Sequence, residues 1–371
     1  MAFENIVVHK SSDYHSAFPH IIRLQSGELI SIFRQARVRE GQVGDEHNRT
    51  LTHSHVDADS RIALVRSTDD GATWNPDSLV VVDESDGGSD LNMAMISQLP
   101  SGELVANNHR WFTDGTTQRS DRLSLDRSGR VPSSVVFDSL YFNRSSDDGH
   151  TWGDPQPVEV ESIAYRAHTG KSDIITMPDG TLLTTINGYG EAGGVDRVYV
   201  VRSRDGGSTW AEPSLVLGDP DGRIGFGEPP VVRLASGRLL VVTRTSEVGG
   251  FLYQAHSDDG GWVWQGQRRT PIWGFPCHLL QLRSGTIVCA YGYRREPFGV
   301  RATMSHDEGE TWDIGREIVL RDDGLHRDLG YPASIQLEDD RILTIYYFHG
   351  EDGIRHIAGT IWSEDDPMRG L

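Results

Sequence analysis

Cysteine is scarce in this chain of 371 residues, and basic residues are outnumbered. Cys277 and Cys289 are the only cysteines, too few for a disulfide framework, so we expect both as free thiols. The 35 lysines and arginines face 54 aspartates and glutamates, a formal net charge of −19. This excess argues against nucleic acid and anionic membranes as partners. A local group of arginines could still bind a small anion.

Long apolar runs and helical periodicity are also missing. No run reaches the length of a membrane span, and we find no stretch with a 3.6-residue apolar period, so we expect very little helix. Residues 1–18 lack a basic start, an apolar core and a cleavage site, which predicts a cytoplasmic protein for the chain as written. A secreted or periplasmic location would follow if a signal had been removed. No linker divides the chain, so 1–371 is predicted to be one domain.

What the chain has instead is one eight-residue pattern, Ser-x-Asp-x-Gly-x-Thr-Trp, written five times. The Asp can accept backbone N–H groups in an Asx-type turn, and the Gly supplies a positive φ. The Trp offers an apolar face to a neighbouring unit. Such regular copies indicate a repeat architecture. They occupy 67–74, 145–152, 203–210, 257–264 (with Val263 in the Thr position) and 305–312.

A second repeat alternates with the first. Each copy has two short apolar, β-branched runs joined by a turn containing Gly or Asp, which predicts a β-hairpin. Six hairpins predict six blades. The sixth is followed by only one further strand, so the segment 5–9 could supply the missing outer strand and close a ring without free sheet edges. The copies are 19–35, 92–111, 172–188, 229–244, 277–294 and 332–350.

The eight-residue pattern resembles the Asp box of the sialidase (neuraminidase) and BNR-repeat superfamily, along nearly the whole chain. The resemblance implies an all-β, six-bladed propeller of four-stranded antiparallel blades, with the Asp boxes at the end opposite the site. It also implies that the five Asp-box aspartates are structural. These are Asp69, Asp147, Asp205, Asp259 and Asp307.

Two residues resemble the catalytic pair of that family. Glu228, before the fourth hairpin, matches a glutamate that polarises a tyrosine hydroxyl. Tyr331, before the sixth, matches that tyrosine and is the candidate nucleophile. A neutral phenol suits a sugar whose anomeric carbon bears a carboxylate, because a carboxylate nucleophile would be repelled; its proton must go to a base, since its free pKa is near 10.

The family's general acid is an aspartate on the loop before the first Asp box. Asp57 and Asp59 both fit, and His53 and His55 are alternatives because histidine titrates near neutrality. The histidine spacing in this loop does not favour a metal site, so we expect neither metal nor cofactor.

Sialidases hold the substrate carboxylate with three arginines. Arg244, at the end of the fourth hairpin, matches one of them, and Arg37 matches a family arginine at the end of the first, with Arg34 as another that could reach the axis. Arg294 or Arg301 is expected to be the third.

The first hairpin departs from the family pattern. It begins Ala17-Phe18-Pro19, where sialidases usually have an arginine, and a methyl group cannot replace a guanidinium fork. His278 and His168 begin inner strands and are also expected at the axis.

These features predict exo-acting, retaining hydrolysis of a terminal anionic sugar, sialic acid or a related acid, with a glycan or oligosaccharide as partner. A ring of His, Tyr and Arg would equally suit a uronate-polysaccharide lyase, and a glycosidase of other specificity or a non-catalytic glycan-binding propeller are further alternatives. No pattern in the chain specifies an oligomeric state.

Overall fold

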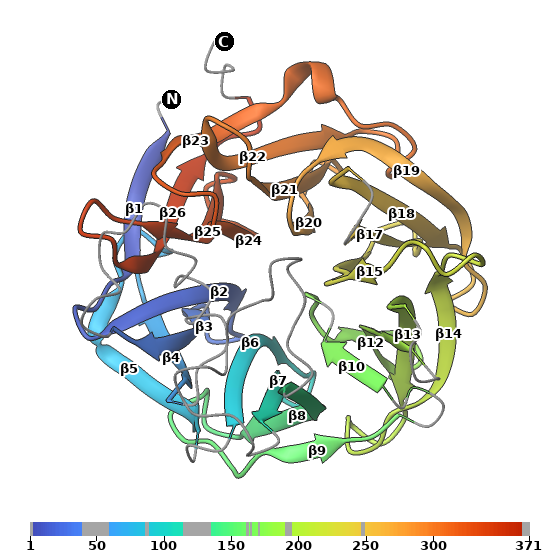
Figure 1. Cartoon of the computed structure of the whole chain (residues 1–371), viewed down its shortest axis with the longest axis horizontal. Helices are drawn as coiled ribbons and strands as arrows, with labels where there is room; N and C mark the ends of the chain where they lie inside the picture. Colours follow the sequence, from blue (N-terminus) through green and yellow to red (C-terminus); the bar gives the residue numbers. More distant parts are fainter. Residues whose placement is uncertain are drawn as a thin grey trace.

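Six sheets surround a central axis in the computed structural model of the chain (Figure 1). In five blades the antiparallel strands follow sequence order from the axis outward, and in the sixth β1 is the outermost strand, so the predicted six-bladed propeller is confirmed. The described part of the chain holds one short 3₁₀ helix, Ile314–Arg316, and none of its helices is long and apolar enough to cross a membrane. The described residues are 3–38, 59–85, 89–113, 135–160, 163, 165–169, 171–189, 195–245 and 249–365.

The two inner positions of each blade are the predicted hairpins. The innermost strands are β2 (Tyr14–Arg23), β6 (Ser89–Gln98), β10 (Tyr165–Thr169) with β11 (Ile175–Thr176), β15 (Phe226–Gly227) with β16 (Val231–Arg233), β20 (Cys277–Gln281) and β24 (Gly330–Gln336). Their partners are β3 (Leu29–Arg37), β7 (Leu104–Thr113), β12 (Leu182–Tyr189), β17 (Leu239–Thr245), β21 (Ile287–Tyr293) and β25 (Ile342–His349).

The outer half of each of the first five blades carries an Asp box. The third strands are β4 (Arg61–Ser67), β8 (Val135–Ser145), β13 (Arg197–Ser203), β18 (Phe251–Ser257), β22 (Phe298–Ser305) and β26 (Arg355–Trp362). The outermost are β5 (Asn75–Glu84), β9 (Gln156–Val158), β14 (Ala211–Leu217), β19 (Gln265–Trp273), β23 (Ile318–Gly324) and β1 (Glu4–His9).

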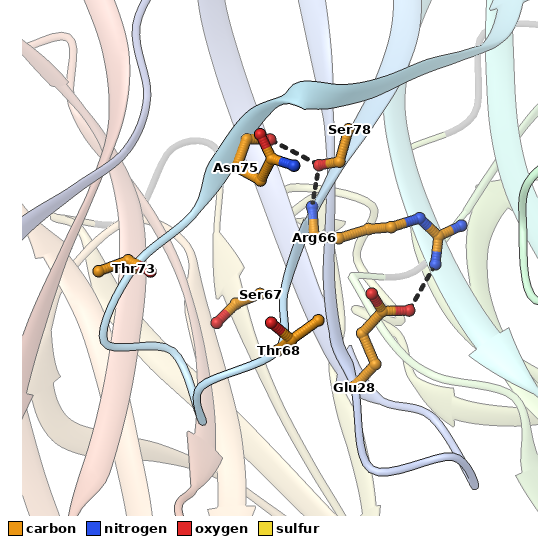
Figure 2. A pocket seen from close by; sticks show the side chains of 7 residues that line it. All are labelled: Glu28, Arg66, Ser67, Thr68, Thr73, Asn75 and Ser78. Atoms are coloured by element: carbon orange, nitrogen blue, oxygen red, sulfur yellow. Dashed lines mark hydrogen bonds and ion pairs between the residues drawn. The ribbon is translucent and has the colours of Figure 1, made fainter.

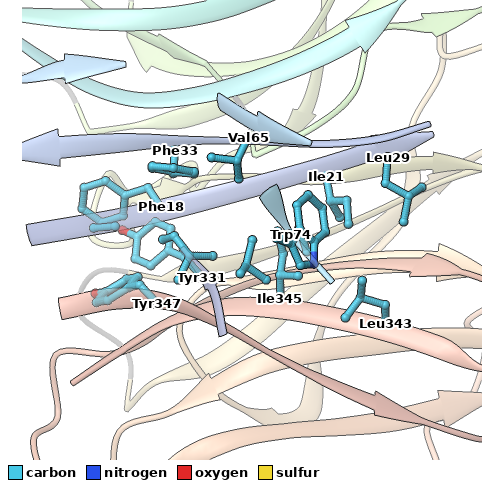
Figure 3. Close-up of a cluster of buried hydrophobic side chains, with 14 of the residues drawn as sticks. Phe18, Ile21, Leu29, Phe33, Val65, Trp74, Tyr331, Leu343, Ile345 and Tyr347 are labelled. Carbon is cyan, nitrogen blue, oxygen red and sulfur yellow. The ribbon is translucent and has the colours of Figure 1, made fainter. Parts of the chain in front are cut away.

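The N-terminal strand closes the ring. β1 pairs antiparallel with β26, with Ile6 opposite Gly359, so the first strand of the chain completes the last blade as expected. The seam between blades 6 and 1 is filled by an apolar cluster that includes Phe18, Phe33 and Tyr347 (Figure 3). Similar clusters lie between the other blades, which is why the blades stand as a closed ring rather than as separate sheets.

The Asp boxes are turns between third and fourth strands. In the second box, Ser145 Oγ donates to Asp147 Oδ1 at 2.7 Å, and Thr151 donates its N–H to Oδ1 and its hydroxyl to Oδ2. Each box follows the end of a third strand, whereas the inner strands begin at the other end of the blade. The boxes therefore lie at the end opposite the inner-strand starts.

Candidate active site

Three residues in or beside the innermost strands have the same unusual backbone conformation. Phe18, Glu228 and Tyr331 each precede a proline, and their φ angles are 57°, 55° and 50°. A positive φ is uncommon outside glycine, and such strain is often held at functional sites. The conformation turns side chains from blades 1, 4 and 6 toward one another. Phe18 and Tyr331 have ring centroids 4.6 Å apart, from strands β2 and β24 (Figure 3).

The two candidate catalytic residues are in direct contact. The Tyr331 hydroxyl donates to Oε1 of Glu228, across 103 residues of chain. Arg244 Nε donates to Oε2 of the same carboxylate at 2.5 Å. The Glu228 backbone N–H is held by Asn187 Oδ1 at 3.2 Å. The carboxylate is thus fixed between the tyrosine hydroxyl and a guanidinium.

Charge in this group favours an ionised glutamate and a protonated tyrosine. Burial opposes ionisation, but the charge of Arg244 and the hydrogen bonds from Tyr331 and Arg244 outweigh it, so the pKa of Glu228 is lowered. Burial and the negative charge of Glu228 raise the pKa of Tyr331. Glu228 can therefore act as a base, and the phenol keeps its proton until a reaction removes it.

Arg294 is the second arginine at this site. Its guanidinium carbon is 5.7 Å from the Tyr331 ring centroid, and its Nη2 donates to the Tyr347 hydroxyl at 3.2 Å. Its charge, like that of Arg244, acts to lower the pKa of Glu228. Two arginines face one carboxylate, which leaves a formal positive charge to attract an anion.

A supporting network lies behind Arg294. The Tyr347 hydroxyl donates to Asp328 Oδ1 at 2.7 Å, and Arg355 Nη1 donates to Oδ2 at 2.9 Å. Sequence reasoning missed Tyr347, Asp328 and Arg355, because nothing in or beside the last hairpin distinguishes them from ordinary strand and loop residues. Asp328 also lies with His326 and His349 in the one group of metal-type side chains found among the described residues.

Arg34, the alternative arginine of the first hairpin, binds residues of the next blade. It is buried, with Nη2 2.5 Å from Asp90 Oδ1 and Nε donating to the Leu91 carbonyl at 2.8 Å. It lies directly opposite Ala17 in the β2–β3 register. A blade 1 arginine is thus present beside the position where the family motif has one, but a carboxylate holds it.

Arg37 and Arg301, which we expected to converge with Arg244, have other partners in the described part of the chain. Arg37 is exposed and stacks 5.2 Å over Tyr14. Arg301 donates to Glu317 and lies 3.4 Å over the Tyr293 ring. Tyr14 is on the innermost strand β2, and Glu317 immediately precedes β23. Of the two candidates in the fifth blade, Arg294 is the one that contacts Tyr331.

The remaining candidates divide into buried and undescribed residues. His278 is buried, accepts the Ser334 N–H at Nδ1 (3.2 Å), and lies 6.1 Å from the ring of His20, so it contacts the innermost strands of blades 6 and 1. His168 lies on β10, but its side chain is outside the described part. Asp59 precedes β4, while Asp57, His53 and His55 lie outside the described residues.

Lys171 is a further residue that sequence reasoning missed. It is fully buried, and its Nζ donates to the Pro332 carbonyl, immediately after Tyr331. Burial lowers the pKa of Lys171 to about 7. It joins blade 3 to the backbone that carries the tyrosine; a single lysine in a polar loop provides no sequence signal for this contact.

A pocket of about 190 Å³ lies away from this centre, beside the first Asp box (Figure 2). Its charged groups are already paired, since Arg66 Nη1 donates to Glu28 Oε2 at 2.7 Å. It lies at the Asp-box end, so we treat it as part of the turn structure. Its lining residues are Glu28, Arg66, Ser67, Thr68, Thr73, Asn75 and Ser78.

Comparisons with known proteins agree with this architecture. The BNR repeat-like domain family matches residues 116–346. A sialidase from Bacteroides fragilis (strain YCH46) is 22% identical over 370 residues, and the match covers 95% of this chain and 63% of the sialidase. The chain therefore spans less than two thirds of the length of that relative.

Solved structures show the same propeller. A protein of unknown function from Dyadobacter fermentans DSM 18053 has a TM-score of 0.81 at 28% identity, covering 97% of this chain and 98% of that one. The Trypanosoma rangeli sialidase in complex with sialic acid has a TM-score of 0.65 at 15% identity, covering 97% and 59%. The fold is that of the sialidases.

Proposed function

Because this chain belongs to the family that carries the BNR repeat-like domain, and because its axis brings a tyrosine onto a glutamate, we propose that it is a sialidase-like exo-glycoside hydrolase. Its substrate is a glycan ending in an anionic sugar, sialic acid or a related acid, cleaved with retention of configuration. The observation that carries this proposal is the hydrogen bond from Tyr331 to Glu228, with Arg244 on the other carboxylate oxygen.

In the first step, the Tyr331 oxygen bonds to the anomeric carbon while the bond to the leaving oxygen breaks. Glu228 takes the phenolic proton, and Asp59 or Asp57 gives a proton to the leaving oxygen. In the second step, water attacks the anomeric carbon and displaces Tyr331. The acid carboxylate takes the proton of the water, and Tyr331 regains its own from Glu228. Two displacements on one carbon give net retention.

The arginines supply the grip on the anion. Arg294 and Arg244 converge near Glu228, and charge-assisted hydrogen bonds to a carboxylate are among the strong ones in proteins. Arg34 stands opposite Ala17 but is held by Asp90. The proposed site therefore holds the substrate carboxylate chiefly from blades 4 and 5.

A covalent trap tests the reaction class. A fluorinated sialic acid that accumulates glycosyl-enzyme should add its mass to the peptide containing Tyr331, and NMR of the first-formed product should show the α-anomer from an α-linked substrate. Tyr331→Phe is the matched control and should take no label. An unsaturated, ultraviolet-absorbing product formed without water would instead establish a lyase, and a label on another residue would remove Tyr331 as nucleophile.

A further inference from the structure

The seam between blades 6 and 1 contains a buried arginine with an unused side. Arg355, at the start of β26, is 0% exposed, and its Nη1 donates to Asp328. Its Nε and Nη2 are buried and have no hydrogen-bond partner. These two N–H groups form one edge of the planar guanidinium, the edge that binds carboxylate, sulfate or phosphate through two parallel hydrogen bonds. Leaving both without an acceptor costs free energy.

His349 adds a second unpartnered group. It lies directly opposite Arg355 in the β25–β26 register, so both side chains leave the same face of the sheet at the same height. Its Nε2 is also buried without a hydrogen-bond partner, 3.9 Å from Asp328 Oδ2. Unused polar atoms thus come from two neighbouring strands at one place.

His326 is the third polar side chain of the group, and its hydrogen bonding distinguishes a cation site from an anion site. One side-chain atom each of His326, Asp328 and His349 lie within 4.8 Å of one another, a spacing that a metal ion could also use. However, His326 Nδ1 accepts the Asp328 N–H at 2.9 Å, so in the neutral imidazole Nε2 carries the proton and is a donor. A guanidinium beside a metal would add positive charge to positive charge. The N–H groups of Arg355 and the histidines outnumber the acceptors here, and N–H donors bind anions.

We propose that this seam is an oxyanion-binding site, in which the Nε–Nη2 edge of Arg355 binds two oxygens of the ligand and His349 donates to it. Asp328 does not belong to the ligand set; it fixes the opposite edge of the guanidinium through Nη1. Asp328 and Tyr347 connect Arg355 to Arg294 beside the Tyr331–Glu228 pair, but anion binding by Arg355 does not depend on the proposed hydrolysis. The oxyanion is either a free inorganic ion or a charged group on a bound glycan.

Diffraction with selenate, an anomalous scatterer shaped like sulfate, locates the ion directly. Wild-type crystals should show an anomalous peak within hydrogen-bonding reach of Arg355 Nε and Nη2. Arg355→Lys keeps the charge but lacks the fork, and should lose the peak. Arg321→Lys is the matched control and should keep the peak. Arg321 also pairs with an aspartate, since its Nε donates to Asp323 at 2.6 Å in blade 5.

Two soaks separate the sources of the oxyanion. A peak with free selenate assigns the site to an inorganic ion; sulfate-ester density only with a sulfated monosaccharide assigns it to a ligand group. No anion at the seam in either soak overturns the proposal, as does a peak that persists in Arg355→Lys. A zinc ion bound by His326, Asp328 and His349 in a zinc soak, with no anion, would show a cation site and also overturn it.

Solution binding provides the second measurement. In a titration with sulfate, Arg355→Lys should bind the ion roughly tenfold more weakly than wild type, or weaker still, since one bidentate contact is lost. If that variant does not fold, His349→Gln leaves the Arg355–Asp328 pair intact and should still weaken sulfate binding. Equal sulfate affinities in wild type and the folded variants contradict the proposal.

Discussion

Glu228 and Tyr331 hold left-handed backbone conformations immediately before prolines, at a cost of roughly 1–3 kcal/mol each. The surrounding packing must offset that cost. Around Tyr331 it does so with aromatic contacts, since Phe18 and Tyr347 lie 4.6 and 5.8 Å from its ring. The tyrosine is thereby aimed at the carboxylate before any substrate arrives, which is the preorganisation that a nucleophile and its base require.

The pair should act as a unit. Glu228→Gln removes the base but keeps the shape, and we expect kcat to fall roughly 10²–10⁴-fold. Tyr331→Phe should be about as damaging, and the double variant should be little worse than either single one. Steady-state kinetics on an aryl sialoside measures all three. Independent, multiplicative effects would mean that the two residues serve different steps.

The two arginines of the fifth blade allow a matched comparison. Arg294 faces Tyr331, whereas Arg301 is paired with Glu317 on the outer side. Arg294→Ala should weaken binding of a carboxylate-bearing sugar analogue by roughly tenfold or more, because one charge-assisted contact is lost. Arg301→Ala should leave that affinity unchanged. Calorimetry on both variants measures the difference, and equal losses would place the anion elsewhere.

Which residues the sequence could identify depends on how local their signals are. Glu228 and Tyr331 stand beside prolines at the starts of hairpins and Arg244 stands at the end of one, so a repeat-based alignment finds all three. Lys171 reaches Pro332 across 161 residues, and no local pattern records such a contact. Arg37 ends β3 and Arg301 lies within β22, but neither position indicates which way the side chain turns. Their aromatic and carboxylate partners, Tyr14 for Arg37 and Glu317 and Tyr293 for Arg301, determine that.

The Asp box joins blades as well as turning a chain. Arg66, the residue before the first box, donates from Nη2 to the Asp148 carbonyl of the second box at 2.6 Å. Arg144 occupies the same position in the next blade and donates to the Gly206 carbonyl at 3.0 Å. The repeat thus carries its own connection to the following unit, which explains why the motif is retained so regularly along one chain.

The fourth Asp box lacks one hydrogen bond that the fifth box has. Thr311 donates its hydroxyl to Asp307 Oδ2 at 2.6 Å, but Val263, 64% exposed, has no hydroxyl to offer Asp259. Val263→Thr should therefore raise the free energy of unfolding by about 1 kcal/mol, and Thr311→Val should lower it by a similar amount. Urea denaturation measures both. Changes of the same sign in the two variants would show that side-chain packing, rather than the hydrogen bond, controls the turn.

In the described residues, the prediction of elements missed two interruptions of inner strands. The fourth inner strand is split into β15 and β16 around Glu228-Pro229-Pro230, since proline has no N–H for the ladder. The third is split into β10 and β11. An alternation of apolar residues predicts that a hairpin exists, but not that its inner strand breaks to present a side chain to the axis.

The free energy of unfolding should fall in two separate pH ranges as the solution is acidified, because buried histidines and Asp-box aspartates titrate at different pH. Burial lowers the pKa of His9 and His109 to about 4 and that of His15 to about 3, with nearby arginines adding to the effect. The unfolded chain binds protons at these histidines from about pH 6.5, so stability falls as the pH drops below that value. The loss of stability below about pH 6.5 therefore comes from histidines that are neutral and buried in the folded protein.

The second pH range is that of the Asp boxes. Hydrogen bonds from Thr209 and Ser203 lower the pKa of Asp205 from 3.8 to about 2. Because the folded-state value is the lower one, this carboxylate stabilises the fold above about pH 4 and loses that effect as the pH falls through 2.

Two variants separate the two pH ranges, each serving as the control for the other. Asp205→Asn cannot ionise, so its deficit in urea midpoint relative to wild type should be constant from pH 7 to 5 and shrink between pH 4 and 2. His9→Gln keeps a polar side chain beside Gln35 but removes a titrating group, so its midpoint should fall less than that of wild type between pH 6.5 and 4. A single acid transition with the same pH dependence in all three proteins would mean that neither set of groups controls it. The ring would then be opening through general charge repulsion, as its carboxylates protonate and its net charge becomes positive.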